Sequence, residues 1–302
     1  MRLAVLDVGS NSAHLQIVES RRSSEPLSHV YRLKAPTLLA EEVTPGGALT
    51  QDGVDRVVSA VISTVEASRE HAVADLIPLA TATIRDATNN AEIRRRVREA
   101  TGVELRSLTG EDEARVTFLA VRRWLGRSAS GQMLLLDIGG MSMEIAAGRG
   151  EHPDVAVTLP LGAGQLTRRL LPVHPAPRDA VEAVRDQVRD TVRPVLKRLA
   201  RQPRPKHIIG TSKTFKQLAR MTGDERRLTC AGLRRWVPRL AAMTVPERAA
   251  LPGVAPTRAR QLLAGAVTAA TVMECLDIGE LDVCPWALRE GLLLRRITEL
   301  RG

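Results

Sequence analysis

Two copies of one short motif carry the residues of this chain that are best suited to chemistry on phosphate. The first copy occupies residues 3–11 and contains Asp7, and the second occupies residues 134–142 and contains Asp137. Each copy is an apolar strand that ends in an aspartate and a glycine-containing turn. Glycines let backbone amides of such a turn approach anionic oxygens, and the carboxylate can hold a metal. The repetition predicts a phosphate and metal site made of two halves.

The length and composition of the chain fit two domains of ordinary size. Its 302 residues are 44% hydrophobic, which is enough for a sizeable core. No apolar run reaches the length of a membrane-spanning helix, and Met1 leads directly into a strand without a secretory signal. We therefore expect a cytoplasmic protein without membrane association. Cys230, Cys275 and Cys284 have no CxxC spacing, so neither a disulfide framework nor a zinc site is predicted.

The charge of the chain is divided unevenly. Residues 1–121 hold 14 of the 44 Lys and Arg and 17 of the 34 Asp and Glu, so the net charge is −3 there and +13 over residues 122–302. A strongly basic half predicts a polyanionic partner. The aromatic content of 2% argues against nucleic acid, because single-strand binders usually stack bases on aromatic rings. A merely solvated basic surface is the alternative, and charge alone does not separate the two.

The two motifs begin two similar series of predicted elements. Hydrophobic periodicity predicts strands at 3–6, 13–18, 30–33 and 76–80 and helices at 52–71, 91–100 and 111–125. Residues 126–131 are predicted to form a linker. The second series has strands at 133–136, 143–147, 155–159 and 206–209, with helices from 163, at 178–200, after 210–213, and at 231–243, 258–275 and 287–300. Repeated units of this kind predict an α/β fold of two related halves with mixed sheets and a ligand crevice between the halves.

Several further segments, together with 7–12 and 137–144, resemble the exopolyphosphatase and guanosine pentaphosphate phosphohydrolase (Ppx/GppA) family in its short two-domain form. These segments follow in the family's order at 80–87, 110–115, 159–164, 210–214 and 286–291. The resemblance spans nearly the whole chain. It implies two actin-like domains of the ribonuclease H-like superfold that actin, sugar kinases and heat-shock ATPases share, with an active-site cleft between them. Domain I would cover 1–125 and domain II 126–302, with the final helix packing back on domain I.

The resemblance also implies an activity and its substrates. Family members remove the terminal phosphate of inorganic polyphosphate, or the 5′ γ-phosphate of guanosine pentaphosphate, with water and a divalent cation such as Mg²⁺. The chain lacks the additional C-terminal domain of longer relatives, from which we expect a preference for short polyphosphate. A homodimer is expected by analogy, and no nucleic-acid partner is expected.

Two residues are implied to act on the reacting phosphate. Glu113 matches the family's catalytic glutamate, which could orient or deprotonate the attacking water. Arg85 matches an arginine that stabilises charge on the phosphoryl oxygens. The alternatives are that Glu113 complements a helix dipole, as we expect for the neighbouring Glu111 and Asp112, and that Arg85 is a surface residue.

The remaining site residues are implied to bind metal or phosphate. Asp137 and Glu144, with Asp7, would hold Mg²⁺ or its waters. Phosphate oxygens would be bound by glycine backbones and polar side chains of the two turns and by a lysine before a helix: Gly9, Ser10, Asn11, Ser12, Gly139, Gly140, Ser142 and Lys213. Each polar residue of this set could instead be an ordinary turn residue.

Two residues depart from the family pattern. Lys213 stands where many members have glycine, and it could contact phosphate or point into solvent. Met141 replaces the third glycine of the second turn, and a side chain there would be strained if the position needed a positive φ. An impaired site would make the chain a sensor of polyphosphate or nucleotide. The sequence also leaves open a guanosine pentaphosphate phosphohydrolase and a kinase-like ATPase.

Overall fold

The computed structural model describes residues 1–19, 27–39, 42–126 and 130–301, which form two compact units. Unit 1 consists of Met1–Thr109 and Arg289–Gly302, and unit 2 consists of Gly110–Leu288. The sequence predicted a boundary between residues 125 and 126, whereas the helix over 110–125 belongs to unit 2. Residues 127–129 of the predicted linker lie outside the described residues.

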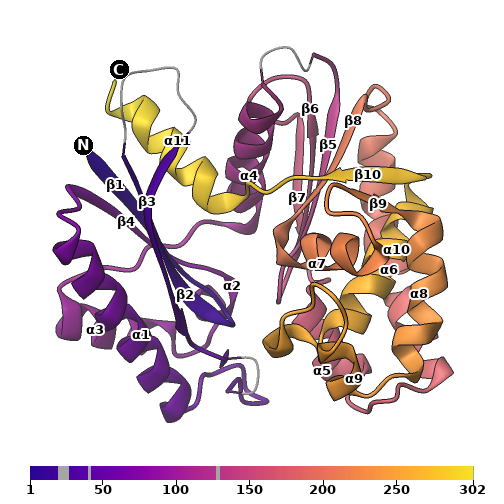
Figure 1. Ribbon diagram of the computed structural model, residues 1–302, viewed down its shortest axis with the longest axis horizontal. Helices are drawn as coiled ribbons and strands as arrows, with labels where there is room; N and C mark the ends of the chain where they lie inside the picture. Colours follow the sequence, from indigo (N-terminus) through magenta and orange to yellow (C-terminus); the bar gives the residue numbers. More distant parts are fainter. Residues whose placement is uncertain (20–26, 40–41, 127–129, 302) are drawn as a thin grey trace. The chain divides into compact units, whose positions relative to one another are not determined.

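Unit 1 is built on a mixed sheet with the strand order β3-β2-β1-β4 (Figure 1). The strands are β1 (Arg2–Val8), β2 (Ser12–Glu19), β3 (Ser28–Pro36) and β4 (Asp75–Ala80). β4 runs parallel to β1, and the other neighbours are antiparallel. The helices are α1 (Gln51–Glu70), α2 (Ala82–Arg85) and α3 (Asn90–Thr101), together with α11 (Leu288–Glu299), which belongs to this unit from Arg289 onward.

The core of unit 1 follows from the alternation of side chains along β1. Ala4, Leu6 and Val8 are buried on one face of the sheet, where they pack with valines of α1 and with α3. α1 begins at a Thr50 cap, whose side chain accepts a hydrogen bond from Gly53 N. This packed face fixes the end of β1, and Asp7 with it.

Unit 2 is built on a larger mixed sheet with the strand order β7-β6-β5-β8-β10-β9. Its strands are β5 (Met133–Ile138), β6 (Met143–Gly148), β7 (Val155–Leu159), β8 (His207–Thr211), β9 (Arg227–Thr229) and β10 (Glu280–Val283). The helices and one short 3-10 turn are α4 (Gly110–Leu125), α5 (Ala163–Leu170), α6 (Arg178–Leu199), α7 (Ser212–Thr222), α8 (Cys230–Ala242), α9 (Val245–Ala249), η2 (Pro256–Arg258) and α10 (Leu262–Cys275).

Both faces of this second sheet are covered, because successive residues of β5 point to opposite sides. Met133 and Leu135 pack with Phe118 of α4, whereas Leu134 and Leu136 belong to a larger core with α5, α6, α7 and α10. The first four strands of unit 2 repeat the order and directions of the four strands of unit 1. The predicted α/β fold of two related halves with mixed sheets is confirmed.

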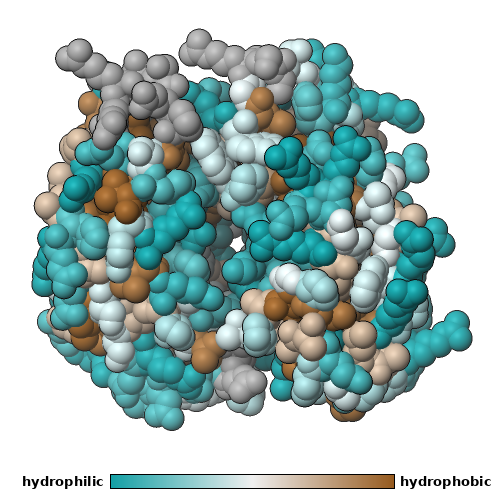
Figure 2. Space-filling view, viewed as in Figure 1, coloured by the Kyte–Doolittle hydropathy of each residue, from teal (hydrophilic) through white to brown (hydrophobic). Residues whose placement is uncertain are grey.

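Short elements account for the differences between predicted and observed secondary structure. β9, β10, α2 and α9 are three to five residues long and carry too little periodicity to be recognised. The helix predicted at 258–275 begins only at Leu262, as α10, and the short 3-10 turn η2 precedes it. None of the helices in the described ranges is long and apolar enough to cross a membrane. On the face shown in Figure 2, apolar side chains lie in scattered patches among hydrophilic ones.

Candidate active site

The unit 2 half of the site is a pair of carboxylates on neighbouring strands. Asp137 near the end of β5 lies directly opposite Glu144 of β6 in the antiparallel register. Residues opposite each other in such a pair have side chains on the same face of the sheet. The strands themselves therefore bring together the two carboxylates that the resemblance assigned to a metal.

The electrostatics of this pair are unfavourable for two negative charges. Glu144 is only 7% exposed. Burial and the nearby charges of Asp137 and Glu113 raise the pKa of Glu144 to about 8. Burial also raises the pKa of Asp137 to about 6, although the positive charges of Lys216 and Arg258 oppose this shift. A cation bound here would relieve the repulsion.

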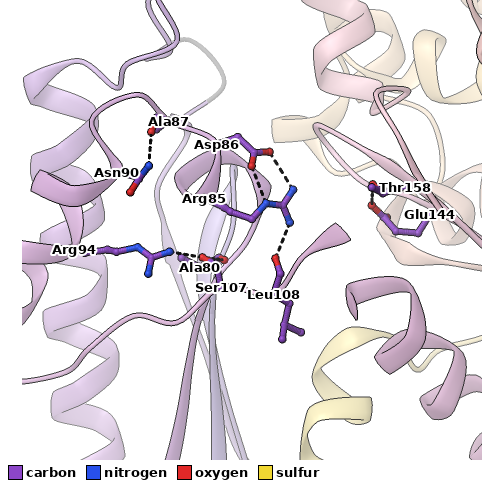
Figure 3. Close-up of polar contacts among 10 residues, drawn as sticks. All are labelled: Ala80, Arg85, Asp86, Ala87, Asn90, Arg94, Ser107, Leu108, Glu144 and Thr158. Carbon is purple, nitrogen blue, oxygen red and sulfur yellow. Dashed lines mark hydrogen bonds and ion pairs between the residues drawn. The ribbon is translucent and has the colours of Figure 1, made fainter. Parts of the chain in front are cut away.

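Glu113, the predicted catalytic glutamate, lies in the first turn of α4 and belongs to this same cluster. It is 8% exposed, and its charge acts on Glu144. Gly110 starts the helix in close contact with β7, because a Cβ at this position would lie 2.6 Å from the Cβ of Thr158. Thr158 in turn donates a hydrogen bond to Glu144 Oε1 at 3.1 Å (Figure 3). The close approach at Gly110 thus sets Glu113 relative to the carboxylate pair.

Ser212, the first residue of α7, also lies beside Asp137. Its hydroxyl donates to the carbonyl of Ile138 at 2.9 Å, and the same hydroxyl lies close enough to Asp137 to lower the pKa of that carboxyl. Ser212 has φ +89°, in the left-handed region that side chains other than glycine rarely adopt. Strain of this kind persists where surrounding contacts impose it, and it often marks functional sites. The sequence motifs did not single out Ser212.

The two strand-aspartate motifs close their turns in the same way. Gly9 N donates to Ser12 O at 3.1 Å, and Gly139 N donates to Ser142 O at 2.9 Å. The amides of Gly9 and Gly139 are therefore used inside the turns and are not the ones that face a ligand. That Gly9 and Gly139 belong to phosphate-binding turns stays a prediction, and in it other amides of the turns must contact the phosphate.

Other amides of the unit 2 turn are directed away from the fold. Ala163 N donates to Gly139 O at 3.0 Å, and Gln165 N donates to Gly140 O at 2.9 Å. The carbonyl and the following amide of a trans peptide point in opposite directions. The amides of Gly140 and Met141 therefore point away from α5. Consecutive amides directed to one side form a cradle for anions.

The unit 1 turn has the same arrangement with a different partner. Leu39 N donates to Ser10 O at 2.6 Å, and Thr37 N donates to Asn11 O at 3.1 Å. The amides of Asn11 and Ser12 consequently point away from the segment after β3. Both turns thus direct amides outward by fixing their carbonyls to the segment after the third strand of the sheet.

The carboxylate of Asp7 in unit 1 lies near an arginine. Arg289 of α11 is 3.8 Å from its Oδ2, and Oδ1 is buried without a hydrogen-bond partner among the described residues. Burial raises the pKa of Asp7, and the charge of Arg289 opposes the shift. A buried oxygen without a hydrogen-bond partner is free to accept one from a bound ligand or water.

Arg85, at the end of α2, is held by its own neighbourhood in unit 1. Its Nε and Nη2 donate to the two carboxylate oxygens of Asp86 at 2.7 and 3.0 Å, and Nη1 donates to Leu108 O at 3.1 Å (Figure 3). The side chain is 20% exposed. These bonds occupy the fork formed by Nε and Nη2, so a phosphate bound at that fork would have to displace the carboxylate of Asp86.

Two basic residues of unit 2 approach Asp137 although no sequence motif assigned them to the site. Lys216 and Arg258 both lower the pKa of Asp137, whereas Lys213 is exposed on the first turn of α7. Lys216 could have been found from its spacing, since it lies one helical turn after Lys213. Arg258 follows a proline in η2 and had no such signal.

Met141 is accommodated without backbone strain. Its φ lies outside the left-handed region, and its Sδ lies 3.7 Å from Nη2 of Arg168. Gly162 instead makes the close approach, because a Cβ there would overlap the backbone of Gly140 and Met141. The backbone strain that a positive φ would cause at Met141 is therefore absent.

The residues of unit 2 fit a hard divalent cation. No group of three or more His, Cys, Asp and Glu in the described part of the chain could hold a metal ion. Mg²⁺ usually retains several waters and binds one or two carboxylates, so a pair is sufficient. Asp137 and Glu144, whose mutual repulsion raises the pKa of Glu144, form such a pair.

Known proteins resemble this chain over nearly its whole length. The model of the Ppx/GppA phosphatase family matches residues 16–300. The chain is 43% identical to exopolyphosphatase 1 of Mycobacterium tuberculosis, over 98% of this chain and 88% of the relative. It is 42% identical to exopolyphosphatase 1 of Mycobacterium leprae, over 98% and 90% of the two chains.

Solved structures show the same fold. A Ppx/GppA family member from Aquifex aeolicus is 25% identical with a TM-score of 0.83, over 100% of this chain and 99% of that one. An exopolyphosphatase from Cytophaga hutchinsonii has a TM-score of 0.88 at 22% identity, over 99% and 98%. The actin-like fold and the family predicted from the sequence are both confirmed: the chain belongs to the Ppx/GppA phosphatase family.

Proposed function

We propose that this chain is an exopolyphosphatase, which hydrolyses the terminal phosphoanhydride bond of inorganic polyphosphate. The observation that carries the proposal is the cluster of Glu113, Asp137 and Glu144 beside outward-facing turn amides, within one compact unit. The names of the mycobacterial relatives support the substrate class. A phosphoanhydride hydrolase needs groups that position water and neutralise charge on phosphate oxygens, and this cluster supplies both.

The residues of unit 2 divide the work in this proposal. Asp137 and Glu144 hold a divalent cation, which neutralises charge on the phosphate oxygens when bound. The amides of Gly140 and Met141 donate to oxygens of the terminal phosphate. Glu113 accepts a proton as a water oxygen attacks the terminal phosphorus. The bond to the bridging oxygen breaks, and the products are orthophosphate and a chain shorter by one phosphate.

The first experiment removes the charge of the proposed base. We expect Glu113→Gln to lower phosphate release by a factor on the order of 10² to 10⁴, the range of general-base contributions, while the affinity for polyphosphate is retained. Glu111→Gln is the matched control, because Glu111 lies on the same helical turn and, within the described part of the chain, its ion pairing is limited to a long contact with Arg115 at 3.9 Å. Normal turnover by Glu113→Gln would refute the assignment.

The second experiment separates the substrates. Phosphate release is measured from tripolyphosphate, long-chain polyphosphate, guanosine pentaphosphate and ATP, each with Mg²⁺ and with a chelator. We expect polyphosphate to be preferred and the chelator to abolish release. A higher kcat/KM for guanosine pentaphosphate would assign the chain to the other activity of its family. Faster hydrolysis of ATP would instead favour a kinase-like ATPase.

A further inference from the structure

The charge pattern of α6 changes abruptly along its length. Over its middle turns each arginine faces an acid three residues earlier, as in Arg189 with Asp186 at 3.0 Å and Arg193 with Asp190 at 2.5 Å. After Asp190 the next acidic residue is Asp224. The last turns of the helix and the segment after it therefore hold basic residues without local acids.

We define the α6 basic surface by the exposed basic residues of this stretch: Lys197, Arg198, Arg201, Arg204 and Lys206. None of the five forms an ion pair within the described parts of the chain. This contrasts with other exposed arginines, such as Arg95, Arg227 and Arg234, which each have a carboxylate within 4.0 Å. Five positive charges within ten residues repel one another unless an anion lies near them.

Stabilisation of the helix explains only part of this surface. Lys197 and Arg198 lie in the last turn of α6, where cations complement the helix dipole. Arg201, Arg204 and Lys206 lie beyond the helix and gain little from it, since the dipole effect falls off within one turn. The charge of these three residues is therefore available for a partner.

The α6 basic surface lies at the edge of the sheet opposite the carboxylate pair. Lys206 N donates to Gln132 O at 2.8 Å, immediately before β5 begins. β5 and β8 are parallel, so their first residues meet at this edge, and Asp137 and Thr211 meet at the other. Along the chain β8 follows α6 and leads directly into α7. Its five residues separate the two edges by roughly 16 Å.

The lack of aromatic residues near the α6 basic surface favours a phosphate chain over single-stranded nucleic acid as its partner. Residues 191–214 contain no aromatic residue, and Phe215 is fully buried. Single-stranded nucleic acid is usually bound by stacking its bases on aromatic rings, and nothing here supplies them. A chain of phosphates offers charge alone, and exposed lysines and arginines are sufficient to bind it.

We propose that the α6 basic surface binds the distal part of a long polyphosphate chain while its terminal phosphate occupies the site at the ends of β5 and β6. This proposal rests on the proposed function. A three-phosphate substrate is too short to reach both edges, whereas a long polymer can follow the outside of unit 2. The surface therefore favours long chains, contrary to the short-chain preference expected from sequence.

The test neutralises the surface and compares substrates of different length. A variant with all five residues changed to Gln is expected to raise KM for long-chain polyphosphate at least tenfold, with kcat and the kcat/KM for tripolyphosphate changed less than twofold. The salt dependence of KM for the long chain should also become shallower. The matched control changes five exposed, ion-paired arginines to Gln: Arg95, Arg189, Arg193, Arg227 and Arg234. Equal losses on both substrates, or equal effects in the control, would overturn the proposal.

A binding experiment separates this proposal from the activity itself. Glu113→Gln, with and without the five substitutions, is titrated with long-chain polyphosphate and with single- and double-stranded DNA of matched charge. Tenfold weaker polyphosphate binding on neutralisation, with weak DNA binding throughout, supports the surface whether or not the chain hydrolyses polyphosphate. If DNA binds as tightly as polyphosphate and loses as much, the surface recognises nucleic acid and the proposal fails. Absence of hydrolysis alone would refute the proposed function only.

Discussion

Asp7 and Asp137 stand at equivalent positions of two sheets that share strand order, strand directions and turn geometry, but their electrostatic surroundings differ. In unit 1 the residue opposite Asp7 on the neighbouring strand is His14, and Arg289 provides a positive charge. In unit 2 the residue opposite Asp137 is Glu144. The repeated backbone fixes where each carboxylate lies, and the residue across the strand pair decides what it does. The second motif places the carboxylates of Asp137 and Glu144 side by side, and two adjacent carboxylates can bind a cation.

The largest expected effect comes from replacing each of the two equivalent aspartates in turn. Asp137→Asn should lower kcat by a factor on the order of 10³, because it removes one charge from the two carboxylates proposed to bind the cation. It should also raise the Mg²⁺ concentration needed for half-maximal rate. Asp7→Asn should lower kcat by about tenfold and leave that concentration unchanged. Steady-state rates across a Mg²⁺ titration measure both effects. An equal change in Mg²⁺ requirement would show that the two aspartates play one role.

A second expectation concerns pH and metal removal. The folded-state pKa values of about 6 for Asp137 and 8 for Glu144 exceed the ordinary values near 4, so the folded state binds more protons between these limits. Stability of the chelated protein should fall by several kcal/mol as pH rises from about 4 to 8, because the unfolded state gives up these protons at lower pH than the folded state does. The thermal midpoint, measured with chelator and with Mg²⁺, checks this.

Two controls sharpen the pH measurement. Glu144→Gln should flatten the fall in chelator, because the neutral amide has no proton to lose. Mg²⁺ should restore the midpoint at pH 8 in the parent protein but not in this variant. A midpoint that rises with pH in chelator would contradict the assigned direction of the pKa shifts.

Substitutions of Ser212 are expected to have a smaller effect, on the stability of the protein. Ser212→Ala removes the hydroxyl bond to Ile138 O but keeps a Cβ at φ +89°, so it should destabilise the protein by about 1 kcal/mol. Ser212→Gly loses the same bond but relieves the backbone, and its stability should stay within about 0.5 kcal/mol of the parent. Urea unfolding compares them. Equal destabilisation by both would mean that the backbone stores no strain.

The smallest expected effect is at Met141. Because its backbone is outside the left-handed region, Met141→Gly should change kcat/KM less than threefold. The change is measured on tripolyphosphate and long-chain polyphosphate. A large gain in rate would instead support an impaired site and a sensing role.

Much of the fold was predictable because long apolar strands and amphipathic helices carry strong periodicity. β1 and β5 were recognised from four consecutive apolar residues each, whereas β10, four residues long, offers only an alternation of buried and exposed side chains. The pairing of Asp137 with Glu144 depends on strand register, which a motif read along one strand does not state. The direction of the Gly9 amide depends on the hydrogen bonds of its turn. Ser212 was missed because positive φ at a non-glycine residue leaves no mark in sequence.

The discontinuity of unit 1 has a consequence for how the protein is made. Gln16 of β2 and Glu290 of α11 are both buried and joined by a side-chain hydrogen bond of 2.9 Å across 274 positions of the chain. Arg296 of the same helix donates to Asp75 of β4 at 2.6 Å. During synthesis the ribosome must complete all of unit 2, a continuous segment, before these partners exist. Unit 2 can therefore mature on the ribosome, whereas unit 1 already has the four strands of its sheet but lacks the contacts of α11 until residues 288–299 have been made.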